Sequence, residues 1–246
     1  MRKAIAPVYQ PIVDADTGIV LHYEALARTR NSNSVSVGDH GRLIELGELI
    51  GFIDLVDIAM LEHVVEALRS NPRVVVAVNV SGVTIERSCN ELLATIFKNM
   101  EFMRRVVFEI TETSEIRDQR MLTRFLVSVR LLDARVALDD FGTGFCTLDL
   151  VRQVKPEFVK LDGDVVRHFD DTGDATAIRE VVKLVHGYGG EIIAEHVDSK
   201  RKADAMRDLG IRYLQGFYVG DFVTNLPEID FCVITMGGEQ RLAAAG

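Results

Sequence analysis

Short hydrophobic runs and stretches with helical spacing alternate along this chain, and the alternation predicts its fold. Residues 8–13 and 19–27 are strand-like runs, separated by the turn-forming sequence DADTG at residues 14–18. Because parallel neighbours need a crossover of about a dozen residues or more, this short connection predicts an antiparallel pair.

After this hairpin the pattern becomes strand, helix, strand, helix. Residues 52–70 place apolar side chains on one helical stripe, and residues 74–82 form the near-continuous apolar run of a strand buried on both faces. Comparable patterns predict strands at 106–112, 135–140, 158–163, 191–197 and 213–220, and helices at 90–100, 121–133, 177–189 and 202–210.

Eight predicted strands with helices between most of them indicate a parallel sheet. In a chain of 246 residues they favour an α/β fold of the closed (β/α)₈ TIM-like barrel type over an open doubly wound sheet. The N-terminal hairpin predicts that the first strand of this barrel is antiparallel. We expect one barrel domain over residues 1–236 and a disordered tail at 237–246.

The most distinctive stretch is RVALDDFGTGF at residues 135–145, a strand that ends in Asp139 and Asp140 and runs into a glycine-rich loop. Two neighbouring aspartates converge on one target only where a strand breaks into a turn, and Gly142 and Gly144 are expected to supply that turn. In a barrel the chemistry lies at the carboxyl ends of the strands. The same end of other strands carries further polar residues: Glu24 and Arg28, Asn79, Glu109 and Glu112, Lys160 and Asp162, Glu195, and Gln215.

These side chains have the chemistry of a metal site. Carboxylates that lie close together raise one another's pKa unless cations compensate their charge. Oxygen ligands without a Cys or His cluster select hard ions such as Mg²⁺ or Mn²⁺ rather than a zinc–thiolate site. Asp139 is the natural bridge between two such ions, which would hold the attacking and leaving oxygens of an in-line displacement at phosphorus. Lys160 could then orient the attacking water, and Arg28 could clamp a non-reacting phosphate.

Composition narrows the range of partners. Lys and Arg total 28 against 37 Asp and Glu, a net charge of −9, and no Lys/Arg-rich run occurs. Duplex nucleic acid and anionic membrane surfaces are therefore disfavoured. Three cysteines at irregular spacing suit the reduced thiols of a cytosol. No signal peptide or run of apolar residues long enough to span a bilayer is evident, so we expect a cytoplasmic protein without a membrane segment.

Seven short motifs follow one another along the chain: YEALAR at 23–28, NVS at 79–81, EITE at 109–112, DDFGTGF at 139–145, KLD at 160–162, AEHVD at 194–198 and QGF at 215–217. They resemble, in order, the motifs of the EAL-domain cyclic-di-GMP phosphodiesterases, and the resemblance extends over nearly the whole chain, from about residue 9 to residue 227. It implies metal-dependent hydrolysis of cyclic di-GMP to linear pGpG in a bacterial cytoplasm. It also implies a homodimer and an association with sensor or diguanylate cyclase domains.

The resemblance also implies a role for each matching residue. Glu24, Asn79, Glu109 and Asp139 resemble the ligands of a first Mg²⁺ or Mn²⁺ ion, and Asp139 would be shared with a second ion completed by Asp140 and Glu195. Lys160 resembles the residue that positions and helps to activate the nucleophilic water, with Glu195 and Asp140 also in the catalytic group. Glu112 resembles an acid that tethers the loop after residue 141. The residues that resemble substrate contacts are Arg28, Leu26, Gln215 and Asp162.

Some segments depart from the family pattern. The sequence between Arg28 and Leu49 differs from the usual one, and His196 in AEHVD stands where a glycine is usual. A histidine beside an acid in a barrel strand is more often a packing residue or an outer-shell donor than a metal ligand. None of these changes removes a proposed ligand, which favours an active enzyme.

Two alternatives stay open at this point. One is a catalytically silent cyclic-di-GMP receptor that signals to a partner protein. The other is a barrel glycosidase with two carboxylates, which is disfavoured because the chain has no tryptophan to stack sugars and because Asn79 and Lys160 would have no role.

Overall fold

The strand order identifies the architecture. In this computed structural model, residues 2–31, 34–35, 47, 50–111, 116–142 and 144–227 are described. Their strands follow the order β1-β9-β8-β7-β6-β5-β4-β2-β3, and β1 also pairs with β2. This is the order of a (β/α)₈ barrel, so the predicted fold class is confirmed. The strands are β1 (Ile5–Asp14), β2 (Val20–Asn31), β3 (Ser34–Val35), β4 (Val76–Ser81), β5 (Val106–Thr111), β6 (Arg135–Phe141), β7 (Phe158–Leu161), β8 (Glu191–Ala194) and β9 (Tyr213–Gln215).

The predicted antiparallel strand is also confirmed, because β1 runs antiparallel to β9, with Ile12 opposite Gln215. Helices follow most strands, as predicted. In the described residues they are α2 (Ile53–Ser70), α3 (Gly82–Arg87), α4 (Cys89–Lys98), the 3₁₀ helix η1 (Met100–Arg105), α5 (Gln119–Arg130), α6 (Leu148–Val154), α7 (Gly163–Thr172), α8 (Thr176–His186) and α9 (Lys200–Asp208).

Helix α6 corresponds to a short helical turn expected before the strand at 158–163, but two helices, α3 and α7, were not predicted. Helix α3 is only six residues long, too short for a periodic apolar stripe, and begins where the Ser81 side chain accepts a hydrogen bond from Thr84 N. Helix α7 buries only Gly163 and Val166 of its ten residues. Its start is instead fixed by Asp162, whose side chain caps the helix.

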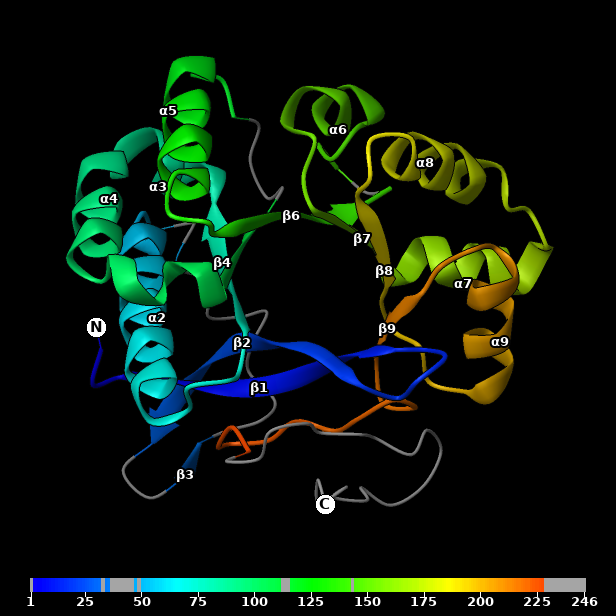
Figure 1. Cartoon of the computed structure of the whole chain (residues 1–246), viewed down its shortest axis with the longest axis horizontal. Coiled ribbons are helices and arrows are strands. Elements are labelled where there is room, and N and C mark those ends of the chain that lie inside the picture. The colour runs from blue at the N-terminus through cyan, green and yellow to red at the C-terminus, as the bar shows by residue number, and fades with distance from the viewer. Residues whose placement is uncertain are drawn as a thin grey trace. The chain divides into compact units, whose positions relative to one another are not determined.

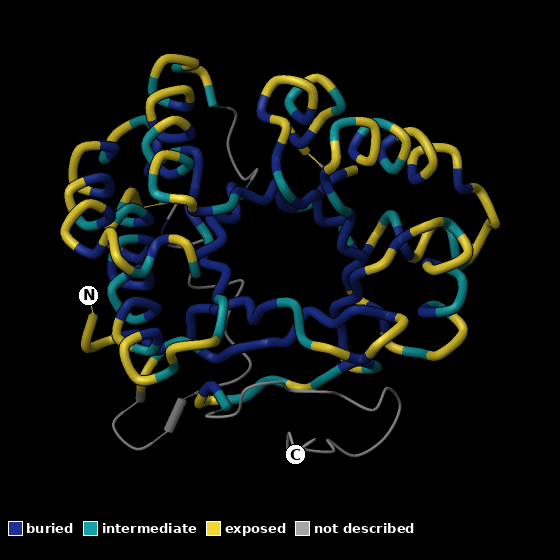
Figure 2. Tube along the Cα trace, viewed as in Figure 1, coloured by how far each residue is buried: buried dark blue, intermediate teal, exposed yellow. Residues whose placement is uncertain are grey.

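The chain forms two compact units, which are described separately. The first comprises Met1–Tyr9, Glu24–Arg135 and Val223–Leu226. Within it β4 and β5 are parallel, and helices α2 to α5 lie alongside them, with α2 against β4 (Figure 1). Phe108 on β5 meets Phe125 on α5 edge to face, with ring centroids 5.5 Å apart. The strands and the inner sides of the helices are buried, and the outer sides of the helices are exposed (Figure 2).

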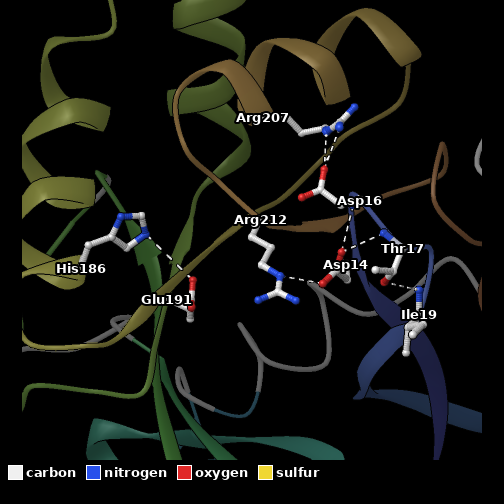
Figure 3. A network of polar contacts seen from close by, with 8 residues as sticks. All are labelled: Asp14, Asp16, Thr17, Ile19, His186, Glu191, Arg207 and Arg212. Carbon is white, nitrogen blue, oxygen red and sulfur yellow. Dashed lines mark hydrogen bonds and ion pairs between the residues drawn. The ribbon is translucent and has the colours of Figure 1, made fainter.

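The described part of the second unit comprises Gln10–Tyr23, Val136–Phe222 and Pro227. Its strands β6, β7, β8 and β9 are parallel to their neighbours, and β1 adds the antiparallel pair to β9. The turn after β1 is held by Asp14, whose carboxylate accepts hydrogen bonds from the backbone N–H groups of Asp16 and Thr17 and pairs with Arg212 Nε at 2.6 Å (Figure 3). Asp16 in turn pairs with Arg207 on α9 at 2.7 Å, so this turn is tied to the segment before β9.

Two predictions fall on residues outside the described part of the chain: the loop-anchoring role of Glu112, and the tail at 237–246. The single domain over 1–236 also stays a prediction. No described helix is both long and apolar enough to cross a membrane.

Candidate metal centre and catalytic residues

The paired aspartates lie on a β-bulge in strand β6. Leu138 is opposite Val159 on β7, but Phe141 is opposite Leu161, so β6 holds one residue more than β7 over this stretch. Asp140 takes a φ of 52°, and its backbone N–H donates to Asp139 Oδ1 at 3.1 Å. The break that was expected at Gly142 and Gly144 therefore begins two residues before Gly142, at Asp140 itself. The bulge is what allows two adjacent side chains to serve one site.

Lys160 lies between two carboxylates. Its Nζ is 3.0 Å from Asp139 Oδ1 and 2.7 Å from Glu195 Oε1, and the residue is only 1% exposed. Strands β7 and β8 are parallel and in register, which brings the end of β8 beside the end of β7. A lysine buried this completely requires such partners, because an unpaired charge in the interior is costly.

The same cluster holds more negative than positive charge. One oxygen from each of Asp139, Asp140 and Glu195 can be chosen so that all three lie within 4.8 Å of one another. Three carboxylates around one ammonium leave an excess of negative charge. A divalent cation would compensate this charge, and carboxylate oxygens are ligands that Mg²⁺ and Mn²⁺ accept.

The first unit carries a second set of predicted ligands. Asn79 Nδ2 donates to Glu24 Oε1 at 3.0 Å, and Asn79 is opposite Glu109 in the register of β4 and β5. Glu24 and Glu109 are 3% and 0% exposed. Asn79 Oδ1 is buried and has no hydrogen-bond partner among the described residues. An orphaned amide oxygen beside a buried carboxylate fits a cation, because a cation would satisfy both groups.

A buried aspartate missed by the sequence reasoning supports this second set. Asp57 on α2 accepts hydrogen bonds from Ser81 N at 2.8 Å and Thr84 Oγ1 at 2.6 Å, just after Asn79 along the chain. It thereby ties α2 to the turn between β4 and α3. The signal was present in the sequence, since Asp57 interrupts the apolar stripe of its helix next to Val56.

Asp57 leads to a prediction on stability. Burial raises the pKa of its carboxyl from 3.8 to about 6. The hydrogen bonds from Ser81 and Thr84 lower the pKa, but their effect is smaller than that of burial. The folded state therefore keeps a proton that the unfolded state loses, and raising the pH from about 4 to about 7 should lower the free energy of unfolding by about 2 kcal/mol relative to Asp57→Asn. Denaturant unfolding at the two pH values measures this difference. Glu66→Gln, which removes an exposed carboxylate from the same helix, is the control; the same pH dependence in both variants would contradict the prediction.

A comparison with known protein families covers most of the chain. The family model described as "EAL domain" matches residues 1–221. The chain belongs to the EAL-domain family. The domain is 23% identical over 220 residues to the cyclic di-GMP phosphodiesterase PdeF of Escherichia coli, covering 85% of this chain and 29% of PdeF. It is 25% identical over 243 residues to PdeL of the same organism, also named a cyclic di-GMP phosphodiesterase, covering 94% of this chain and 66% of PdeL.

A solved structure gives the same fold. The Bacillus subtilis YkuI protein, determined with cyclic di-GMP and calcium, matches with a TM-score of 0.78 at 21% identity, covering 93% of this chain and 58% of YkuI. The EAL domain described here spans less than a third of the length of PdeF and about two thirds of the length of PdeL.

The predicted substrate contacts of this EAL domain are packed to different degrees. Leu26 and Arg28 on β2 are 8% and 3% exposed, and Arg28 Nη1 donates to Ala27 O at 3.0 Å. Burial lowers the pKa of Arg28, and nearby Glu24 opposes that shift. In the second unit, Gln215 Nε2 donates to Gln10 Oε1 at 3.0 Å, a partner that sequence reasoning missed. Asp162 Oδ1 accepts from Asp164 N at 2.6 Å as the cap of α7. Their role in binding stays a prediction.

Proposed function

We propose that this EAL domain is a metal-dependent phosphodiesterase that hydrolyses cyclic di-GMP to linear pGpG. The observation that carries the proposal is the buried Lys160, paired with both Asp139 and Glu195 beside Asp140. Family membership and the names of the E. coli relatives support the choice of substrate.

Two divalent cations, Mg²⁺ or Mn²⁺, are part of this proposal. Glu24, Asn79 and Glu109 would be ligands of one ion, Asp140 and Glu195 would serve the other, and Asp139 would be common to both. When bound, such ions activate water and stabilise charge on phosphoryl oxygens. The orphaned Oδ1 of Asn79 and the excess of carboxylates around Lys160 support this ligand set.

Each residue of the Lys160 cluster has a proposed task. Lys160 Nζ, fixed by two carboxylates, donates a hydrogen bond that orients the attacking water and stabilises negative charge at phosphorus. Glu195 and Asp140 are acceptors for the protons of that water. Water adds to phosphorus, the bond to one 3′ oxygen breaks, and the proton released by the water ends on that oxygen. Arg28, Leu26, Gln215 and Asp162 are proposed substrate contacts, and Glu112 is proposed to anchor the loop after β6.

An assay of turnover tests the proposal. The purified chain is incubated with cyclic di-GMP and Mg²⁺ or Mn²⁺, and the products are separated by liquid chromatography. We expect pGpG to accumulate, and its formation to stop when EDTA removes the cations. Asp149→Asn, which changes an exposed carboxylate on α6, is the matched control and should leave the rate unchanged.

The second candidate is a receptor that binds cyclic di-GMP without cutting it. Calorimetric titration with cyclic di-GMP in Ca²⁺, run beside the turnover assay, separates the two. Binding with intact substrate after long incubation in Mn²⁺ would favour the receptor and contradict the enzyme. A homodimer, a sensor or diguanylate cyclase partner, and a bacterial cytoplasmic location belong to the same proposal, supported by family membership.

A further inference from the structure

His196 has a backbone conformation that its side chain disfavours. Among the described residues, four that are not glycine have a positive φ: Asp133, Asp140, Lys155 and His196. Asp133 and Lys155 follow the ends of α5 and α6, where a left-handed residue is common, and Asp140 lies in the bulge of β6. His196, with a φ of 54°, follows Glu195 at the end of β8. Such strain persists where the surrounding structure imposes it, and it concentrates at functional sites.

The backbone around His196 is held firmly. Glu195 N donates to Leu161 O at 3.2 Å, and Val197 N donates to Gln215 O at 3.0 Å. Tyr218 N donates to Val197 O at 3.0 Å. Neighbouring strands therefore fix the chain immediately before and after His196, which accounts for the persistence of the strained φ.

The imidazole of His196 lies face-on against Gly163, the first residue of α7. A Cβ built on Gly163 would be 2.6 Å from Cγ, 2.8 Å from Nδ1 and 2.9 Å from Cδ2 of the ring. A point at nearly equal distance from three adjacent ring atoms lies above the face of the ring, not beside its edge. Only glycine at position 163 leaves room for this arrangement, and the ring is pinned on one face.

The residue itself is solvent-exposed. His196 is exposed although Glu195 and Val197 on either side are buried. Phe217, in the segment after β9 that is hydrogen-bonded to Val197, is a second exposed ring, with 66% of its surface accessible. Planar side chains are thus exposed just after the carboxyl ends of β8 and β9, where His196 directly follows Glu195 and the Phe217 ring meets Phe222 edge to face.

We propose that the outer face of the His196 imidazole is a stacking surface for a guanine base of the cyclic dinucleotide, which makes His196 a substrate-binding residue. This inference rests on the proposed function and adds a base contact to it. A ring that is packed on one face and belongs to an exposed residue suits a flat heterocycle, and stacking of a base on a planar side chain needs no particular hydrogen-bond pattern. The neighbouring strands impose the positive φ, and a binding role gives histidine a reason to occupy this position in place of glycine.

Substitution at two positions tests the inference. Base stacking predicts that His196→Ala raises both KM for cyclic di-GMP and its Kd in Ca²⁺ by about 5- to 20-fold, with kcat changed far less. His196→Phe should restore both constants to within about twofold of wild type. Gly163→Ala should mimic His196→Ala because its methyl group displaces the ring, and it should have no added effect when His196 is already alanine. His168→Ala on α7 is the matched control.

Thermal unfolding separates binding from packing. Glycine takes a positive φ without strain, so His196→Gly should melt no lower than wild type while KM rises. A lower melting temperature with unchanged KM and Kd would show that the ring only packs, and would overturn the inference while leaving the proposed function intact. Failure of the proposed function would show in the wild-type protein. If the wild type binds cyclic di-GMP without hydrolysing it, the effect of His196→Ala on Kd alone decides the inference. If the wild type does not bind cyclic di-GMP, both proposals are overturned.

Discussion

Asp139→Asn is expected to lower the rate of cyclic di-GMP hydrolysis on the order of 10³-fold or more. Asparagine keeps the size of the side chain but removes one negative charge from the cluster around Lys160, where Asp139 Oδ1 is 3.0 Å from Nζ. If Asp139 is common to both cations, the substitution weakens both, and metal ions supply several kcal/mol of charge stabilisation in reactions of this type. The measurement is kcat at saturating Mn²⁺.

Metal binding gives this prediction a second readout. A cation that binds only the folded state raises the melting temperature, and the shift caused by Mn²⁺ in the wild-type protein should be largely lost in Asp139→Asn. Asp149→Asn controls for the removal of a carboxylate elsewhere in the same unit. A rate within about threefold of wild type, or an unchanged Mn²⁺ shift, would show that Asp139 is not the shared ligand.

Much of the fold could be predicted because the spacing of apolar residues distinguishes helices from strands over many residues. The stripe that includes Val56 and Met60, and the buried run of β4, have patterns that only one kind of element satisfies. Helices α3 and α7 were missed for the same reason, since each buries few apolar residues and is fixed mainly by a capping side chain. Caps are local signals, and Ser81 and Asp162 were assigned to other roles or to none.

The sequence predicted which residues form the candidate site and at which end of the strands they lie. Six candidate residues were found by taking the last polar residues of each predicted strand: Glu24, Asn79, Glu109, Asp139, Lys160 and Glu195. The structure buries all of them except Asn79, which is partly buried. Contacts that depend on register were not predictable. The bulge at Asp140 and the partner of Gln215 require knowledge of which strands are neighbours, and a one-residue shift would change both of them.

Lys160→Met is expected to separate the catalytic and structural roles of the buried ammonium. Methionine has a similar length and no charge, so Asp139 and Glu195 would lose the cation that lies 3.0 Å and 2.7 Å from them. Removing one partner of a buried ion pair costs about 3–5 kcal/mol, and losing a group that orients water and assists proton transfer costs about 10²- to 10⁴-fold in rate. In metal-free buffer the variant should therefore melt lower than wild type, and with Mn²⁺ its kcat should fall within that range.

The response to metal distinguishes this account from simple loss of packing. Lys160 and a divalent cation compensate the same carboxylates, so without the ammonium the cluster should attract the cation more strongly. Mn²⁺ should then raise the melting temperature of Lys160→Met by more than it raises that of the wild type, without restoring turnover. A variant whose stability is lowered equally with and without Mn²⁺ would show that Lys160 and the cation act on separate groups. Retention of kcat would remove Lys160 from the reaction.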